Sequence, residues 1–246
     1  MKRSEKKYQT RRIRHRKAYY TTANLHKLLD ALMEAKAGLE AGTIDKQISV
    51  SIGNEKMGLV HSVSLLPFIT CPGICAGTCG KYCYAAKIAL LRSSVLKAYA
   101  RNTALLIWWP EIFWTQVKAA AISARFFRFH VSGDIRNLSH LEQIMKIVRS
   151  CRATKFLIFT KRFDAVNKYL DEHAGKLPRN LKLIFSAEEN ITPDNPHNLP
   201  VAIVLKAGQT PPPGAIVCND NCFDCFLYGK GCWELKPGMI LCFYEH

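Results

Sequence analysis

The spacing of hydrophobic residues changes along the chain in a way that predicts helices and strands in alternation. Near the start, apolar residues recur at helical intervals between Thr22, which can cap a helix, and Gly42, which can end it. These residues are Leu25, Leu28, Leu29, Leu32 and Met33. Strands are expected next at residues 47–52 and 59–66, followed by helices at 85–106 and 111–124.

From residue 126 onwards, short apolar runs and helical patterns follow one another regularly. Strands are expected at residues 126–131, 155–160, 181–186, 201–205 and 215–217, with helices at 138–149 and 164–173. Nearly continuous apolar strands separated by helices indicate βα units and a parallel sheet covered on both faces. The predicted fold class is α/β, with a partial (βα) barrel-like and mostly parallel sheet.

Polar residues follow these strands directly. The carboxyl ends of parallel strands line the ligand crevice in such folds, so residues at these ends are candidate binding residues. They are Ser132, Gly133, Asp134, Lys161, Arg162, residues 186–190 and Lys206. His130 shares a face with Ser132 if the strand alternates, and is either a buried histidine with a satisfied partner or a ligand. Glu188 and Glu189 could supply an acid and a base, but adjacent residues point apart.

Composition narrows the class of protein. The chain has 246 residues, of which 48% are hydrophobic, so a folded domain is expected. No apolar run is long enough to predict a membrane span, and no secretory signal is expected at the basic N-terminus. We therefore predict a cytoplasmic protein, in which ten cysteines favour metal binding over disulfides.

Two groups of cysteines have spacings typical of metal sites. The first group holds four thiols at equal spacing, with glycines that let the loop curl around a cluster, which favours an iron–sulfur cluster over zinc. Its members are Cys71, Cys75, Cys79 and Cys83. In the second group zinc and iron–sulfur remain equally open, and its members are Cys218, Cys222, Cys225 and Cys232. Cys151 and Cys242 are expected to be buried thiols without a ligand role.

Charge is concentrated at the N-terminus. The net charge is +16, and in residues 1–17 nine Lys and Arg stand against the single acid Glu5, so half of the excess lies there. We expect this basic arm to be disordered when alone. It either binds the phosphate backbone of DNA or RNA or serves only to keep the chain in solution.

The motifs resemble a known superfamily. A cysteine loop after the first strand, Tyr82-Cys83-Tyr84, and Ser132-Gly133-Asp134 after the next strand look like the radical S-adenosylmethionine superfamily. The resemblance implies that three cysteines hold a [4Fe-4S] cluster whose open iron chelates S-adenosylmethionine. It also implies that residues 132–134, together with His130, contact this cofactor, and that an electron donor reduces the cluster. The superfamily spacing is three residues and then two, whereas this chain has three throughout.

A closer resemblance is to the phage gene product 88 family of phage- and plasmid-borne proteins. It is carried by residues 83–85, the strand end at 129–134 and the terminal Cys222, Cys225 and Cys232-Trp233. It implies a bacterial host cell as the place of action.

We expect the chain to have four parts: a basic arm (1–17), an N-terminal helix and strand (18–58), an α/β partial-barrel domain (59–217) and a C-terminal cysteine-rich metal-binding segment (218–246). Two hypotheses about its function follow. In the first, the protein is a radical S-adenosylmethionine-like enzyme acting on a nucleic acid or nucleotide. If all four thiols of the first group bind one cluster, no iron is left open and this hypothesis fails. The second is a non-enzymatic nucleic-acid-binding protein stapled by closed zinc or iron–sulfur sites.

Overall fold

The computed structural model describes residues 18–54, 57–73, 78–206, 208–218 and 221–244. The basic arm and Cys75 lie outside these ranges. Eight strands form one sheet in the order β1-β2-β3-β4-β5-β6-β8-β7. Their bounds are Val50–Ser51, His61–Val63, Phe126–Phe129, Lys155–Thr160, Leu181–Ser186, Val201–Leu205, Ile216–Val217 and Ile240–Tyr244 for β1 to β8.

The first pair of strands is antiparallel and all other neighbours are parallel. The sheet is open, with β1 and β7 at its two edges. This arrangement confirms the predicted α/β class with a mostly parallel, partial barrel-like sheet. The sheet extends across the predicted boundaries between the parts of the chain at residues 58 and 217. Strand β1 from the N-terminal part and β8 from the C-terminal part both belong to it.

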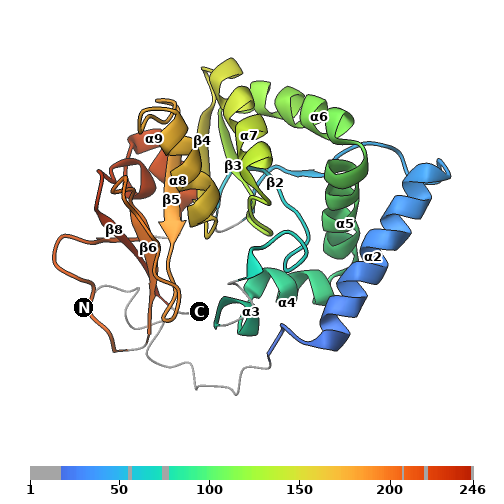
Figure 1. Cartoon of the computed structure of the whole chain (residues 1–246), viewed down its shortest axis with the longest axis horizontal. Coiled ribbons are helices and arrows are strands. Elements are labelled where there is room, and N and C mark those ends of the chain that lie inside the picture. Colours follow the sequence, from blue (N-terminus) through green and yellow to red (C-terminus); the bar gives the residue numbers. More distant parts are fainter. Residues whose placement is uncertain (1–17, 55–56, 74–77, 207, 219–220, 245–246) are drawn as a thin grey trace.

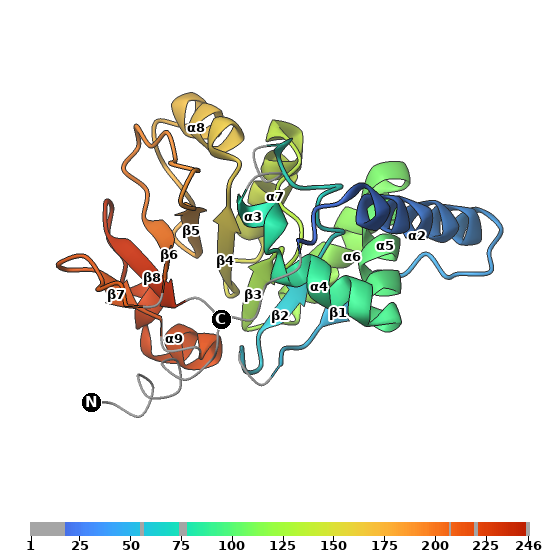
Figure 2. The ribbon, with the colours of Figure 1, turned by 90° about the horizontal axis from the view of Figure 1, so that it is seen from below.

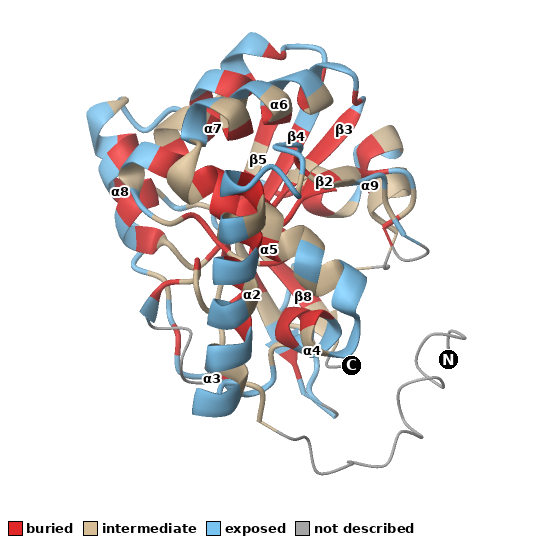
Figure 3. Cartoon of the chain, turned by 90° about the vertical axis from the view of Figure 1, so that its right-hand side faces the viewer, coloured by how far each residue is buried: buried red, intermediate tan, exposed pale blue. Residues whose placement is uncertain are grey.

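One face of the sheet is covered by the larger helices, which Figure 1 shows as an arc around the strands. They are α2 (Thr22–Glu40), α4 (Tyr84–Leu91), α5 (Ser93–Trp108), α6 (Pro110–Ile122), α7 (Leu138–Ser150) and α8 (Phe163–Glu172). The core on this side includes Phe127, Phe129, Phe156 and Phe185 from alternate strand positions. Figure 3 shows the resulting pattern: the strands are largely buried, while the helices carry both buried and exposed residues.

The other face packs against the C-terminal segment. Figure 2 shows helix α9 (Cys222–Tyr228) on the opposite side of the sheet from α7 and α8. With the short 3-10 helix η2 (Gly231–Trp233) it forms a second core that takes Phe126, Leu157 and Ile184 from the strands. The ring of Phe126 stacks on Phe226 at 4.5 Å between centroids. The C-terminal cysteines are thereby brought against the sheet.

The local differences from the predicted elements have simple physical reasons. Helix α2 is capped by Thr21, whose hydroxyl accepts from the Asn24 N–H at 3.2 Å, and not by the predicted Thr22. The sequence does not distinguish the two, because both residues carry a hydroxyl that can cap a helix. The helix predicted over residues 85–106 is two helices, because Arg92 has an extended backbone between α4 and α5. Neither α2 nor any other helix in the described ranges is long and apolar enough to cross a membrane.

Candidate functional site

The turn after β3 fastens two strand ends together. The buried Asp134 carboxylate accepts hydrogen bonds from the Thr160 hydroxyl at 2.6 Å, the Lys161 backbone N–H at 2.9 Å and the Ile135 N–H at 2.7 Å. Burial raises the pKa of Asp134, while these donors oppose the rise. Ser132 is buried as well, and its hydroxyl donates to the Leu65 carbonyl at 2.9 Å. Both side chains therefore have partners within the protein.

The same turn packs closely on the segment that leads into the first cysteine group. Gly133 has φ +79°, and a Cβ there would lie 2.4 Å from Thr70 Oγ1 and 2.8 Å from Leu65 Cβ. The Thr70 hydroxyl is held in place by donating to the Leu66 carbonyl at 2.8 Å. Only glycine fits this contact without rearrangement. The turn thus fixes the path of the chain just before Cys71.

Replacing Gly133 with alanine is expected to destabilise the protein by about 2 to 5 kcal/mol. The left-handed backbone costs about 1–2 kcal/mol for a residue with a Cβ, and the clash adds about 1–3 kcal/mol. The matched control is Gly208→Ala, since Gly208 has φ +84° but nothing within 4 Å of an added Cβ. Urea unfolding of both variants measures the difference. Equal losses would mean that the close approach at Gly133 contributes nothing.

Lys161 links the end of β4 to the end of β5. Its ammonium donates to Ser186 Oγ at 2.9 Å and lies 3.3 Å from Glu188 Oε1. Burial and the neighbouring Cys79 raise the pKa of Cys83, and the Lys161 charge opposes the rise. The Tyr84 hydroxyl, next to Cys83, donates to the Val131 carbonyl at 2.7 Å, so the start of α4 lies against the segment after β3.

Of the first cysteine group, Cys71 precedes α3 (Thr78–Lys81), Cys79 lies within it, and Cys83 stands at the start of α4. Cys83 caps α4, and its sulfur accepts from the Ala86 N–H at 3.4 Å. Cys71, Cys79 and Cys83 are all half-buried. Cys75 falls outside the described residues, so the four-thiol arrangement predicted for this loop stays a prediction.

The C-terminal thiols gather on one short segment. Cys225 and Cys232 are buried, and Cys232 belongs to the second core. Gly231 has φ +56°, and a Cβ there would lie 2.7 Å from Cys225 Sγ, so the backbone passes close to this sulfur. Burial raises the pKa of Cys232; the charges of Cys218, Cys222 and Cys225 raise it further. The four thiols therefore interact electrostatically.

The donor chemistry of this segment fits a thiophilic metal. Cys218, Cys222 and Cys232 lie in or against the second core, and the backbone N–H of Cys232 donates to Cys225. Over the described parts of the chain, however, no three Cys, His, Asp or Glu side chains are arranged as a metal-binding group. The predicted ligands are thus neighbours without a coordination geometry. Cys151 and Cys242 are buried and form no disulfide.

His130 forms a buried pair with His140 of α7. Their Nε2 atoms are 3.0 Å apart, and the Arg136 N–H donates to His140 Nδ1 at 3.4 Å, so His140 donates to His130. Nδ1 of His130 is buried without a partner among the described residues. His130 also has φ +54°, which ends the strand alternation that would have placed it beside Ser132. Sequence reasoning missed His140, although it lies on the buried face of α7.

The histidine pair should make stability fall at acidic pH. Burial lowers the pKa of His130 from 6.5 to about 4 and also lowers the pKa of His140, so both are neutral in the folded protein. The unfolded chain takes up protons first as the pH falls. The contribution is therefore complete above about pH 6.5 and is lost towards pH 4, by about 3 kcal/mol for His130 alone.

The check is urea unfolding between pH 7 and 4. Asparagine tolerates the left-handed backbone, so His130→Asn should fold and show a shallower decline than the parent. His26→Asn, at an exposed position on α2, should leave the decline unchanged. A parent whose stability is flat between pH 6.5 and 4.5 would contradict the buried neutral pair.

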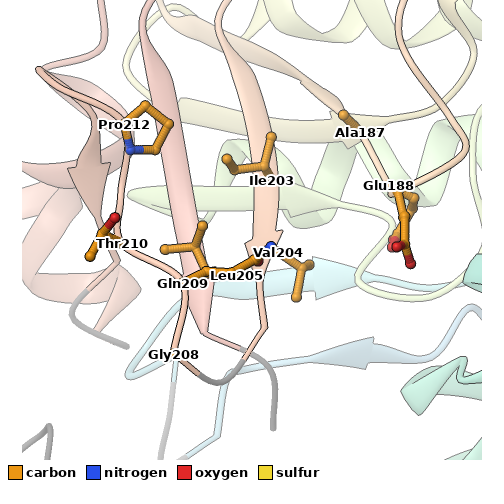
Figure 4. Close-up of a pocket in the computed structure, with 10 residues that line it drawn as sticks. Ala187, Glu188, Ile203, Val204, Leu205, Gly208, Gln209, Thr210 and Pro212 are labelled. Carbon is orange, nitrogen blue, oxygen red and sulfur yellow. The ribbon is translucent and has the colours of Figure 1, made fainter.

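An open pocket of about 510 Å³ lies at the ends of β5 and β6 (Figure 4). Its lining includes Glu188, Glu189 and the apolar strand residues Ile203, Val204 and Leu205. The two glutamates point to different cations, since Glu189 pairs with Lys206 at 2.7 Å and Glu188 with Lys161. The expectation that these adjacent residues point apart is confirmed.

Arg162 does not reach the pocket lining. Its guanidinium donates to the Arg136 carbonyl and lies 3.8 Å from Asp164 Oδ1. Among the candidates after the strands, the structure therefore brings Lys161, Ser186 and Glu188 together.

The fold and these residues define a class of open, mostly parallel α/β proteins. The first cysteine segment meets the sheet at its carboxyl edge, and the C-terminal one packs on the face opposite the larger helices, here called the inner face. The family model of Gene product 88 matches residues 24–227. The chain belongs to the Gene product 88 family. A search of curated proteins and a search of solved structures each found no significant match.

Proposed function

We propose that the chain binds an iron–sulfur cluster through three of the four thiols Cys71, Cys75, Cys79 and Cys83, which leaves one iron open, and acts as a radical S-adenosylmethionine-like enzyme on a nucleic acid or nucleotide. A second metal, iron–sulfur or zinc, would be held by the C-terminal thiols. The cluster would supply one-electron chemistry next to the strand ends. The residues of this chain would bind the substrate there and exclude water.

One observation carries the proposal. The Gly133 turn packs directly on Leu65 and Thr70, immediately before Cys71. A cysteine loop beside the carboxyl ends of parallel strands would hold a reactive group where α/β proteins bind ligands.

The roles proposed for residues 130–134 need one adjustment. The Asp134 carboxylate already accepts three hydrogen bonds, and the Ser132 hydroxyl and the His130 ring have partners in the protein. In this proposal, main-chain groups of the turn would contact the cofactor, and these side chains would hold the turn in shape.

The test is anaerobic incubation of reduced protein with S-adenosylmethionine. We expect 5′-deoxyadenosine to form, and Cys79→Ser to abolish it while Cys151→Ser, a control at a buried thiol directly after α7 in the helix-side core, retains it. Uncleaved S-adenosylmethionine, together with a cluster that needs all four thiols of residues 71–83, would reject the enzyme hypothesis.

A second candidate is a non-enzymatic nucleic-acid-binding protein stapled by metals. It is favoured by the burial of Cys232 in one core with Phe226 and Leu235, because a structural site is typically closed and packed. Nucleic-acid binding would come from the basic arm. Metal content without any cleavage activity, and with salt-dependent DNA or RNA binding, would favour this candidate.

A further inference from the structure

Two cations stand in one row on the inner face of the sheet. Arg128 of β3 and Lys182 of β5 both lie beside Leu157 of β4, which is in register with each of them. Leu157 belongs to the second core, so the row faces the C-terminal segment. Parallel strands covered on both faces normally carry apolar residues at such positions. Two cations in this row therefore need an explanation.

Neither cation has a carboxylate partner among the described residues. Lys182 donates to the Leu235 carbonyl at 2.8 Å. The Arg128 guanidinium lies 4.9 Å from the centre of the Phe159 ring, and one of its terminal nitrogens is 3.8 Å from Met57 Sδ. Its Nε is buried with no hydrogen-bond partner in the described structure. These are partly desolvated charges that lack an anion.

Leu235, whose carbonyl accepts from Lys182, and Met57, which lies against Arg128, belong to the same core as the buried Cys232. Four thiolates around a divalent zinc ion leave a net charge of about −2, and so do four thiolates around an oxidised [4Fe-4S] cluster. The two cations of the row would neutralise either centre. The same pair therefore suits both metals that the thiols favour.

We propose that Arg128 and Lys182 are the counter-charges of a metal–thiolate centre formed by Cys218, Cys222, Cys225 and Cys232. This inference rests on the proposed metal-binding function. They act as positioning residues, because they stabilise the thiolates without contacting the metal. In the metal-free protein the same cations are a cost, since each is removed from water without an opposite charge.

The opposite signs give a sharp test in full-length protein. Cys79→Ser and Cys83→Ser are introduced first, so that zinc binding reports the C-terminal thiols. Arg128→Met and Lys182→Met should then each weaken zinc binding by about 10- to 100-fold, measured by competition with a chromogenic chelator. The same variants should unfold at an equal or higher urea concentration than the parent when metal-free, and at a lower one when zinc-loaded.

Three comparisons separate this role from others. Arg128→Lys and Lys182→Arg should recover most of the affinity, and Lys118→Met, on the exposed side of α6, should change nothing. Unchanged zinc affinity in the methionine variants, or equal destabilisation of metal-free and loaded protein, would overturn the proposal. A parent that binds no zinc would instead reject metal binding itself, before any variant is compared.

Discussion

Serine in place of Cys232 should remove the metal held by the C-terminal thiols and lower the melting temperature of the loaded protein by about 10 °C. Cys232 is buried in the second core, where its neighbours include Phe226 and Leu235. Losing one thiolate of four sacrifices much of the free energy of metal binding, which in a segment of this kind contributes to folding directly. The effect therefore combines a lost ligand and a weakened core.

The matched control is Cys242→Ser. Cys242 is also fully buried, in β8, and its carbonyl accepts a hydrogen bond from the Cys218 N–H at 2.9 Å. Burial alone raises the pKa of Cys242, whereas burial and the neighbouring thiols raise the pKa of Cys232. Its replacement should cost stability by burying a hydroxyl and leave the metal content unchanged. Metal analysis and thermal unfolding of the two variants measure the contrast. If Cys232→Ser retains its metal, the assignment of this thiol as a ligand is wrong.

Deleting residues 1–17 should produce the largest change in nucleic-acid binding. The arm has a net charge of +8, and each neutralised phosphate of duplex DNA contributes about 0.9 to the slope of log K against log salt. The slope should fall by as much as about 7, and the affinity at low salt by several orders of magnitude.

A variant with the nine basic residues of the arm changed to glutamine keeps its length and should behave like the deletion. Metal content should remain that of the parent in both, because all ten cysteines lie beyond the arm. The slope of log K against log salt is measured by filter binding or fluorescence anisotropy at salt concentrations from about 50 to about 300 mM. Binding that is unchanged in both variants would leave the arm as a solubility device.

Much of the fold followed from hydrophobic spacing. Strands β4, β5 and β6 end where their apolar runs end, and in β4 and β5 the burial of both faces leaves little freedom in the boundaries. The break between helices α4 and α5 at Arg92 could not be predicted from the sequence, since no glycine or proline marks it. The position of β8 between β6 and β7 was also hidden, because strand order depends on contacts that are distant in sequence.

The sequence predicted the edge of the sheet at which the candidate residues gather, but not the contacts that they make there. Polar residues after strands do converge, as Lys161 and Glu188 do. The partner of His130 lies on a helix, so strand alternation gave no hint of it. Arg128 carried a usable signal, because it is a lone cation in the strand Phe126–Phe129. Its importance appears only when the C-terminal segment is seen to pack on the inner face.

The central claim is that the cysteines bind metal, with an iron–sulfur cluster in the first group. The most direct measurement is analysis of iron, zinc and acid-labile sulfide in anaerobically purified full-length protein. The account predicts about four iron and four sulfide per chain from residues 71–83, with further iron and sulfide or about one zinc from the C-terminal thiols. Zinc without sulfide would contradict the iron–sulfur assignment, and a chain free of both metals would contradict the claim as a whole.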